Sequence, residues 1–244
     1  MSETSADDDC LPIRGPAHPC PYLPGKEATF IYARRFPDVE DGWDALLNRG
    51  YRRSGLYVYR TDCDGCRACV PLRVPVGTWM PDRSQRRALA RNADVDLAIG
   101  RPVFDDEKAA LFKRYLESRH DGQMSTAAVD IAEGLYRSPV QTLEISGRLE
   151  GRLVTVGIVD VSPRHWSLVY SAWDPDMSDR SLGTAYIGWA ILLARDMNVP
   201  HVHLGYWIDG SRTMDYKARF RPHEIYVRGE GWIPEVPPPS TMRS

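Results

Sequence analysis

The chain has 244 residues, of which 43% are hydrophobic and 26% charged, the proportions of an ordinary globular protein. This length suffices for one large domain or two small ones, and no run approaches the roughly 20 apolar residues of a membrane-spanning helix. The first nine residues are acidic and polar, unlike a secretory signal, so we expect a cytoplasmic protein without membrane contact.

The net charge of −2 is unevenly distributed along the chain. Residues 49–91 contain ten Arg and three Asp, and 27 of the 31 basic residues in the whole chain are Arg. Arginine forms bidentate hydrogen bonds with phosphates and carboxylates. The basic segment therefore favours an anionic partner on one side of the protein, with a solvated basic face as the alternative.

The N-terminal part of the chain predicts a disordered tail over residues 1–16, rich in Asp, Ser and Pro, followed by a cysteine-containing basic module over residues 17–100. Within the module the pattern predicts a helix at 42–48, a strand at 55–60 and a short helix capped by Ser84.

Gly100-Arg-Pro102 separates this module from a second one over residues 101–234, with a tail at 235–244. Asp105 is a good N-cap for a helix whose apolar residues recur at helical spacing. The pattern then predicts, in order, a helix at 127–136, strands at 140–146, 152–161 and 165–173, a helix at 181–197, and strands at 201–207 and 224–227.

Three strands that lead into a helix and then a further strand are the layout of the GNAT-like acyltransferase fold. We therefore predict an α/β protein with a GNAT-like domain behind an N-terminal cysteine-containing module.

Four cysteines could bind a metal. Cys63, Cys66 and Cys69 follow each other at CxxC spacing, and Cys20 lies upstream. In a cytoplasmic protein this spacing argues against disulfides and fits a zinc ion or an iron–sulfur cluster. Reduced structural thiols are the alternative.

A second set of residues could bind nucleic acid. Arg83, Arg87 and Arg91 lie four residues apart, on one face of the predicted helix, with Arg86 beside them. A phosphodiester backbone would relieve their mutual repulsion, although acidic neighbours could do the same.

Three further segments contain candidate reactive groups. His120 stands next to Asp121, which is typical of proton handling or of a structural turn. Asp174 ends a predicted strand, and Arg180-x-x-Gly183-x-Ala185 fits the pattern with which acyl-CoA transferases of this fold hold a pyrophosphate at a helix start, which would include Ser181.

Aromatic rings and cations alternate in the last of these segments, which contains Tyr206, Tyr216 and Lys217. Such rings can stack on a nucleotide base or grip a peptide. Ordinary packing at a sheet edge is the alternative.

Taken together, the motifs resemble one family, the bacterial aspartate/glutamate leucyltransferases, which are short relatives of the arginyl-tRNA–protein transferases. The resemblance spans about residues 19–232. The matching motifs are Pro19-Cys20-Pro-Tyr22-Leu-Pro24, Gly50-Tyr-Arg52-Arg53-Ser54-Gly55, Cys63-x-x-Cys66-x-x-Cys69, Ser84-Gln85-Arg86-Arg87, Tyr115-x-x-x-Arg119-His120-x-x-Gly122-x-Met124, Ser181-Leu-Gly183-Thr184, Leu204-Gly205-Tyr206 and Met214-x-Tyr216-Lys217-x-x-Phe220.

The resemblance implies that the protein adds leucine from leucyl-tRNA to proteins that begin with Asp or Glu and so marks them for degradation. An ester donor and an α-amine of pKa ~7.7–8.0 require positioning rather than a cofactor. Under this hypothesis, arginines bind the acceptor carboxylate, a base takes the amine proton, and aromatic residues and a lysine hold the aminoacyl end. The candidates are Arg73, Arg119 and Arg180 for the carboxylate, Asp174 or His120 for the proton, and Tyr206, Tyr216 and Lys217 for the aminoacyl end, with Tyr216 also a candidate catalytic group.

Three other functions fit parts of the same sequence. They are arginyl transfer by the same site, acyl-CoA-dependent N-acyl transfer, and RNA binding by a non-catalytic zinc-containing module. The sequence alone does not decide between leucine and arginine as the donor, because an apolar pocket would favour leucine and an acidic one arginine.

Overall fold

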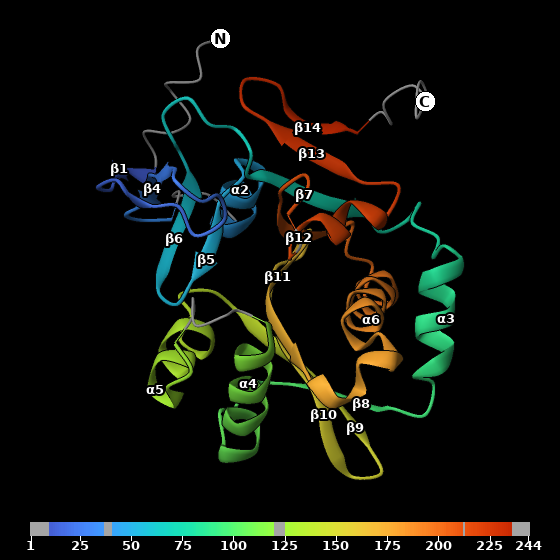
Figure 1. Ribbon diagram of the computed structural model, residues 1–244. Helices are drawn as coiled ribbons and strands as arrows, with labels where there is room; N and C mark the ends of the chain where they lie inside the picture. Colours follow the sequence, from blue (N-terminus) through green and yellow to red (C-terminus); the bar gives the residue numbers. More distant parts are fainter. Residues whose placement is uncertain (1–9, 37–40, 120–124, 212, 236–244) are drawn as a thin grey trace, which may run out of the picture.

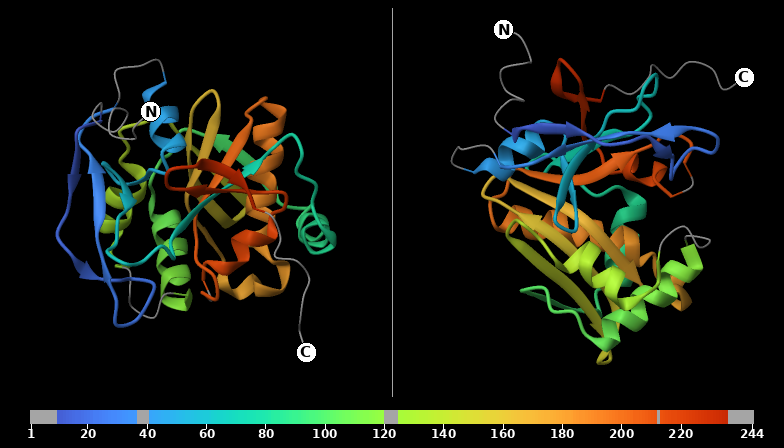
Figure 2. Two further views of the ribbon diagram at one scale, coloured as in Figure 1. Left: turned by 90° about the horizontal axis from the view of Figure 1, so that it is seen from above. Right: turned by 90° about the vertical axis from the view of Figure 1, so that its left-hand side faces the viewer.

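The computed structural model describes residues 10–36, 41–119, 125–211 and 213–235. A large mixed sheet has helices on both faces, and a smaller sheet lies against one of its sides (Figures 1 and 2). No helix of these four ranges is long and apolar enough to cross a membrane.

The large sheet has eight strands in the order β14-β13-β7-β12-β11-β10-β9-β8. All neighbours are antiparallel except β11 and β12, which are parallel. The strands are β7 (Val70–Pro75), β8 (Asp96–Gly100), β9 (Thr142–Leu149), β10 (Arg152–Val161), β11 (His165–Trp173), β12 (His201–Trp207), β13 (Glu224–Val227) and β14 (Gly231–Pro234).

The order of elements confirms the predicted GNAT-like fold. The meander β9-β10-β11 leads through α6 (Leu182–Asp196) to the parallel strand β12. The helix α4 (Asp106–Arg119) packs on one face of this meander through an apolar cluster that includes Leu111, Phe112 and Val156, and it is followed by α5 (Ala128–Ile131) and η2 (Ala132–Tyr136). The face of α6 buries the larger core cluster on the opposite side.

The two parallel strands separate along their length. Backbone pairing between β11 and β12 joins only residues 165–167 to residues 201–203. At this paired end, His203 and His165 are buried and share a hydrogen bond of 3.0 Å, and burial lowers the pKa of His165 to about 3, so the pair is uncharged. Beyond it the strands diverge and leave space between their C-terminal ends.

The smaller sheet has the order β1-β4-β6-β5 and packs with α2 (Gly42–Asn48) around its own apolar cluster. Its strands are β1 (Pro12–Arg14), β4 (Phe30–Ala33), β5 (Arg52–Ser54) and β6 (Tyr57–Thr61), and a two-residue ladder joins β2 (His18–Pro19) to β3 (Glu27–Ala28).

The predicted tail over residues 1–16 is wrong for residues 10–14. Cys10 is buried, and β1 pairs with β4 as an edge strand. Three residues carry no alternating pattern, so pairing with a distant strand decides their conformation. Residues 1–9 lie outside the described ranges.

The predicted boundary at residue 100 does not follow the sheet. β7 lies between β12 and β13, and β8 pairs with β9, although both precede residue 101. β7 contains Pro71 and Pro75. Because proline is unfavourable in a central strand, the sequence pattern does not predict a strand here. The helix α3 (Arg83–Arg91) is capped by Asp82 rather than by Ser84, and β14 is a strand that the sequence pattern did not predict.

One buried ion pair joins the two sheets. Arg53 on β5 donates from Nε to both carboxylate oxygens of Asp160 on β10, each at 2.9 Å, and both side chains are fully buried. The other guanidinium nitrogens donate to the carbonyl oxygens of Gly55, Leu135 and Arg137. A buried charge is stable only when it is paired and hydrogen-bonded, so this contact fixes where β5 can lie.

We expect Arg53→Met to lower the free energy of unfolding by about 3–5 kcal/mol, because it leaves the Asp160 carboxylate buried without its partner. Urea denaturation followed by circular dichroism measures this loss. Arg137→Gln is the control, because the Arg137 side chain is exposed and pairs with exposed Glu133, and it should cost less than about 1 kcal/mol. Equal losses in the two variants would contradict the role of the buried pair.

Candidate functional site

A cavity of about 320 Å³ lies where β11 and β12 separate, between the large sheet and the smaller one. We call it the splay cavity. Its walls come from β5, β6, β11, β12, α6 and the segment around η4 (Asp215–Arg219). Its apolar surface is formed mainly by Leu135, Leu168, Tyr170, Trp173, Ile187, Leu204 and Met214.

Two cations, Arg52 and Lys217, line the splay cavity beside the paired Arg53, and none of the described residues that line it is Asp or Glu. The Arg52 guanidinium lies over the Tyr206 ring, 5.1 Å from its centroid, and its Nε is buried with no hydrogen-bond partner among the described residues. Gly205 allows this approach, because its φ is +79° and a Cβ there would lie 2.9 Å from an Arg52 nitrogen. The cavity therefore holds uncompensated positive charge beside an apolar wall.

Lys217 is the titratable group best suited to proton transfer here. Its Nζ donates to the Tyr206 carbonyl oxygen at 2.9 Å and to the Met214 sulfur at 3.5 Å. Burial, with a smaller contribution from the Arg52 charge, lowers the pKa of Lys217 to about 7. A neutral lysine amine has two N–H groups and one lone pair, so these two contacts leave the lone pair available to accept a proton.

The aromatic candidates differ in their positions. Tyr216 lines the splay cavity, and burial raises its pKa to about 12, so its hydroxyl is a neutral hydrogen-bond donor. Tyr206 is buried beneath Arg52, and its hydroxyl accepts a hydrogen bond from the backbone N–H of Thr61 at 3.0 Å. Tyr206 therefore supports Arg52 rather than lining the cavity.

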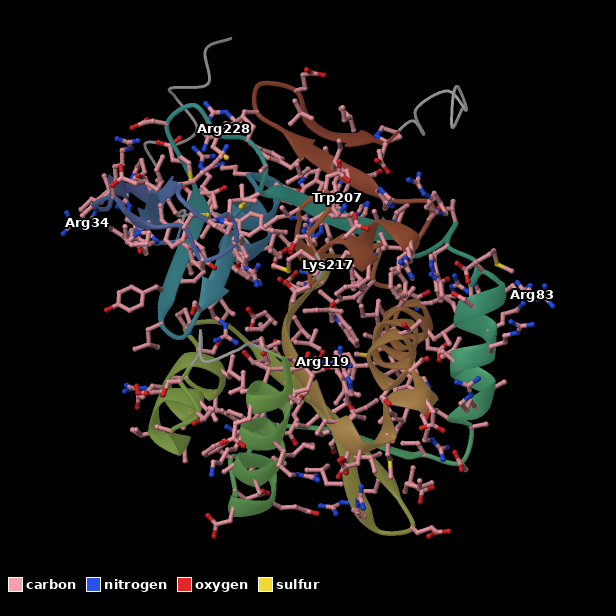
Figure 3. The ribbon with its side chains drawn as sticks, viewed as in Figure 1. Arg34, Arg83, Arg119, Trp207, Lys217 and Arg228 are labelled. Carbon is pink, nitrogen blue, oxygen red and sulfur yellow. The ribbon has the colours of Figure 1, made fainter. Side chains whose placement is uncertain are left out.

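Arg119 lies at the end of α4 with its guanidinium 5.6 Å from the centre of the Trp173 ring, which itself lines the cavity. Figure 3 shows Arg119 and Lys217 facing the same central region of the molecule. Arg119 is exposed and is available to an anionic ligand that enters the cavity. His120, the residue after it, lies outside the described residues.

The prediction that Asp174 is a base is contradicted by its surroundings. The carboxylate is fully buried, accepts the backbone N–H of Asp176 at 3.1 Å at the start of η3 (Pro175–Arg180), and pairs with Arg114 and Arg152. Burial alone would raise the pKa of Asp174, but these hydrogen bonds and charges keep it below the ordinary value. An ionised and fully bonded carboxylate stabilises the loop and is a poor proton acceptor.

Arg73 and Arg180 are also placed differently from the prediction. Arg73 pairs with Glu224 at 2.6 Å and lies over the Trp232 ring, within the large sheet. Arg180 donates to Asn92 and to the Arg91 carbonyl oxygen, and also pairs with Asp94. Both guanidiniums are occupied by the protein itself and lie outside the splay cavity.

The start of α6 does not offer an open pyrophosphate site. Ser181 is left-handed, with φ of 55°, and makes no capping hydrogen bond with its side chain. A Cβ at Gly183 would lie 2.7 Å from the Trp173 ring, so this glycine allows the ring to cover the first turn of the helix. Gly183 thus packs against Trp173 instead of facing an open site. The predicted role of Ser181 in substrate binding stays a prediction.

The arginines of α3 form an exposed face on the other side of α6 from α4 (Figures 1 and 3). Arg86 donates to the Pro81 carbonyl oxygen and Arg91 to that of Asp179. Arg83 and Arg87 project from the same helix. Their predicted contact with tRNA stays a prediction.

The cysteines are all free thiols, and four of them gather in one region. Burial raises the pKa of Cys69 to about 12, and the nearby thiols of Cys20, Cys63 and Cys66 contribute to this shift. Within the part of the chain that the structure describes, no three His, Cys, Asp or Glu side chains are arranged to hold a metal ion. A zinc ion or cluster at these residues therefore stays a prediction, and no step of the chemistry depends on it.

Arg52 is the main site residue that sequence reasoning missed. It belongs to the motif at residues 50–55, which supported the family resemblance but was assigned no role in catalysis or binding. The only local signal was the pair Arg52-Arg53 within this motif. Adjacent strand residues point to opposite sides, so two neighbouring arginines in a strand have different surroundings.

Comparison with known proteins gives a consistent result along the chain. The family models described as "Arginine-tRNA-protein transferase" match residues 18–87 for the N terminus and 107–227 for the C terminus. Proteins named aspartate/glutamate leucyltransferase from Pseudomonas aeruginosa (strain LESB58) and Pseudomonas putida (strain F1) are 39% and 40% identical, covering 88% of this chain and 93% of theirs. The solved structure of FemX superposes with a TM-score of 0.46 and 10% identity, covering 86% of this chain and 83% of that one.

We expect Asp174→Asn to lower the free energy of unfolding by about 1–3 kcal/mol while leaving the pH dependence of activity unchanged. The reason is that Asp174 already has all its partners and remains ionised at neutral pH. Denaturant titration and pH–rate profiles measure the two effects, with exposed Asp176→Asn as the control. A pH profile that loses a limb in Asp174→Asn would restore Asp174 as the base.

Proposed function

The chain belongs to the arginine-tRNA-protein transferase family, and we propose that it transfers leucine from leucyl-tRNA to the α-amino group of proteins that begin with Asp or Glu. The structural observation that supports this most strongly is the splay cavity, which combines an apolar wall with two cations and has no carboxylate among its lining residues. The product carries an N-terminal leucine, the signal that marks it for degradation. The proposed function implies a cytoplasmic location, because charged tRNA is made and used in the cytoplasm.

The acceptor is selected by its charge. Arg52 presents a buried guanidinium edge whose Nε has no partner among the described residues, which suits the side-chain carboxylate of an N-terminal Asp or Glu. Its position on the Tyr206 ring holds the guanidinium in place before the substrate arrives. Arg119 lies at the rim, where it adds positive potential for an approaching acidic peptide.

The donor side chain is selected by the apolar wall. Leu168, Ile187, Leu204 and Met214 offer a leucyl group the environment that it prefers over water. An arginyl side chain would bring a further cation into a cavity that already contains the Arg52 charge and has no carboxylate among the described residues that line it. Leucyl transfer is therefore favoured over arginyl transfer by this same site.

The reaction forms one bond and breaks one. The neutral α-amine attacks the ester carbonyl carbon, the new C–N bond forms, and the C–O bond to the tRNA breaks. Lys217, in its neutral form, accepts the proton that the amine loses and can return it to the departing tRNA oxygen. The Tyr216 hydroxyl is a neutral donor suited to the oxyanion of the tetrahedral intermediate.

The acyl-CoA alternative loses its main support. The predicted pyrophosphate contacts depended on Arg180 and on an open start of α6. The Arg180 guanidinium is bonded to Asn92, Asp94 and a backbone oxygen, and Trp173 covers the helix start.

We expect leucine to pass from leucyl-tRNA to peptides that begin with Asp or Glu, and not to peptides that begin with Lys. Arginyl-tRNA offered separately should react about a hundredfold more slowly or less, because repulsion between like charges costs several kcal/mol in a desolvated site. Transfer of labelled amino acid to each peptide is the measurement.

A matched variant makes this experiment specific for the splay cavity. Arg52→Met should lose most of the preference for an Asp peptide over an Asn peptide, while Arg101→Gln, on an exposed loop, should keep it. Equal rates with leucyl- and arginyl-tRNA, or an unchanged Asp preference in Arg52→Met, would refute the roles given to the cavity.

We expect kcat/KM to rise with pH through about 7, where Lys217 of the free enzyme becomes neutral and able to accept a proton. Lys217→Met and Lys217→Arg should both lose about 10²–10⁴-fold in kcat, and both should lose this limb, because neither side chain is a base near neutral pH. The limb of the acceptor amine near pH ~7.7–8.0, seen in kcat/KM, should persist in both. A Lys217→Arg enzyme that retains the wild-type rate would show that Lys217 acts through its charge alone.

A further inference from the structure

A second cavity of about 320 Å³ lies between the smaller sheet, β7, β13 and the loop at residues 62–69, which we call the cysteine loop. We call the cavity the arginine cavity, because Arg49, Arg60, Arg67 and Arg228 line it and none of the described residues that line it is Asp or Glu. These arginines come from four different segments of the chain, so the fold rather than a local run of sequence gathers them.

The four guanidiniums are not equally satisfied by the protein. Arg67 donates to the carbonyl oxygens of Cys63 and Cys66, Arg228 pairs with Asp62, and Arg60 lies over the Tyr51 ring. The Nη1 atom of Arg49, in contrast, is buried and has no hydrogen-bond partner among the described residues. A buried donor without a partner costs free energy that an anionic ligand could recover.

An aromatic ring completes the arginine cavity. Tyr226 on β13 packs directly on the backbone at Gly50, where a Cβ would lie 2.9 Å from the ring and φ is +76°. The cavity thus presents positive charge together with a tyrosine ring, a combination that recurs where proteins hold a nucleotide by its phosphate and its base.

The arginine cavity and the splay cavity approach each other at one pair of side chains. Tyr206 lines the arginine cavity, Arg52 lines the splay cavity, and both line a further narrow space of about 10 Å³. Arg52 lies over the Tyr206 ring. A ligand in one cavity therefore ends close to a ligand in the other.

We propose that the arginine cavity binds the phosphate-bearing 3′ end of the donor tRNA, so that the aminoacyl ester extends past Tyr206 into the splay cavity. This inference rests on the proposed leucyl transfer. It assigns the tRNA end to residues on β6, β13 and the cysteine loop, separate from the exposed arginine face of α3.

The chemistry favours a nucleotide chain over the acceptor peptide here. The carboxylate of an N-terminal Asp or Glu lies within a few bonds of the reacting amine, so it must bind in the same cavity as the ester, where Arg52 is available. One carboxylate is satisfied by one bidentate guanidinium. Four guanidiniums match a nucleic-acid strand, which carries one negatively charged phosphate per nucleotide.

The test uses Arg49→Gln and Arg228→Gln in the full-length protein. Arg49→Gln disturbs no hydrogen bond of the buried Nη1, and Arg228→Gln removes one partly exposed ion pair. Arg101→Gln removes the same charge from an exposed loop and is the control. Thermal melting identifies any variant that fails to fold.

Two quantities are measured for each variant: the dissociation constant of uncharged leucine tRNA at several salt concentrations, and the separate KM values for leucyl-tRNA and for an Asp-initiated peptide. We expect both cavity variants to weaken tRNA binding and raise the KM for leucyl-tRNA about five- to tenfold, with the salt slope reduced by about 1. The KM for the peptide should stay within twofold of the wild-type value.

Unchanged tRNA affinity and salt slope in both folded variants would overturn the inference. A rise in the KM for the peptide instead of the tRNA would overturn it in favour of an acceptor site. Failure of the proposed function is distinguishable, because the wild-type enzyme would then transfer no leucine, whereas tRNA binding to the cavity is measured without any transfer.

Discussion

The ion pair between Arg53 and Asp160 is the contact on which the geometry of the site depends. It joins β5 of the smaller sheet to β10 of the large one with every guanidinium nitrogen bonded, inside a region from which water is excluded. Two apolar surfaces could slide past each other with little loss, whereas a buried charge has one acceptable partner position. Because Arg52 immediately precedes Arg53 on the same strand, fixing Arg53 also fixes where the Arg52 backbone lies beside the splay cavity.

The separation of β11 and β12 supplies the space that this contact borders. The strands remain paired where His165 and His203 share an uncharged hydrogen bond, and they part beyond Ser167. The parted ends expose apolar residues such as Leu168 and Leu204 to the splay cavity, and α6 contributes Ile187 to its wall. The fold thus creates a cavity at the C-terminal ends of two parallel strands, a position where α/β sheets commonly bind ligands.

The sequence was most informative where the signal is local. The strands at 152–161, 165–173, 201–207 and 224–227 match the observed bounds, because alternation and turn residues act over short distances. It failed where distant pairing decides, as for β7 within the large sheet and for β1. The site shows the same division. Tyr216 and Lys217 lie on the splay cavity, whereas Arg73, Asp174 and Arg180 lie outside it. A charged residue in the sequence does not reveal whether a partner such as Glu224, Arg152 or Asp94 already pairs with it.

The distribution of charge explains how one cavity can select both substrates. Lys217 remains close to neutral only because burial and the nearby Arg52 disfavour its charged form. An acidic acceptor bound to Arg52 would offset part of the Arg52 charge. The proton affinity of Lys217 would then be higher at the step in which the amine loses its proton. A basic acceptor or an arginyl donor would have the opposite effect, since each adds a cation to a site without a carboxylate among its lining residues. Selection of the acceptor and activation of the amine would then follow from one electrostatic arrangement, in which the correct substrate supplies the missing negative charge.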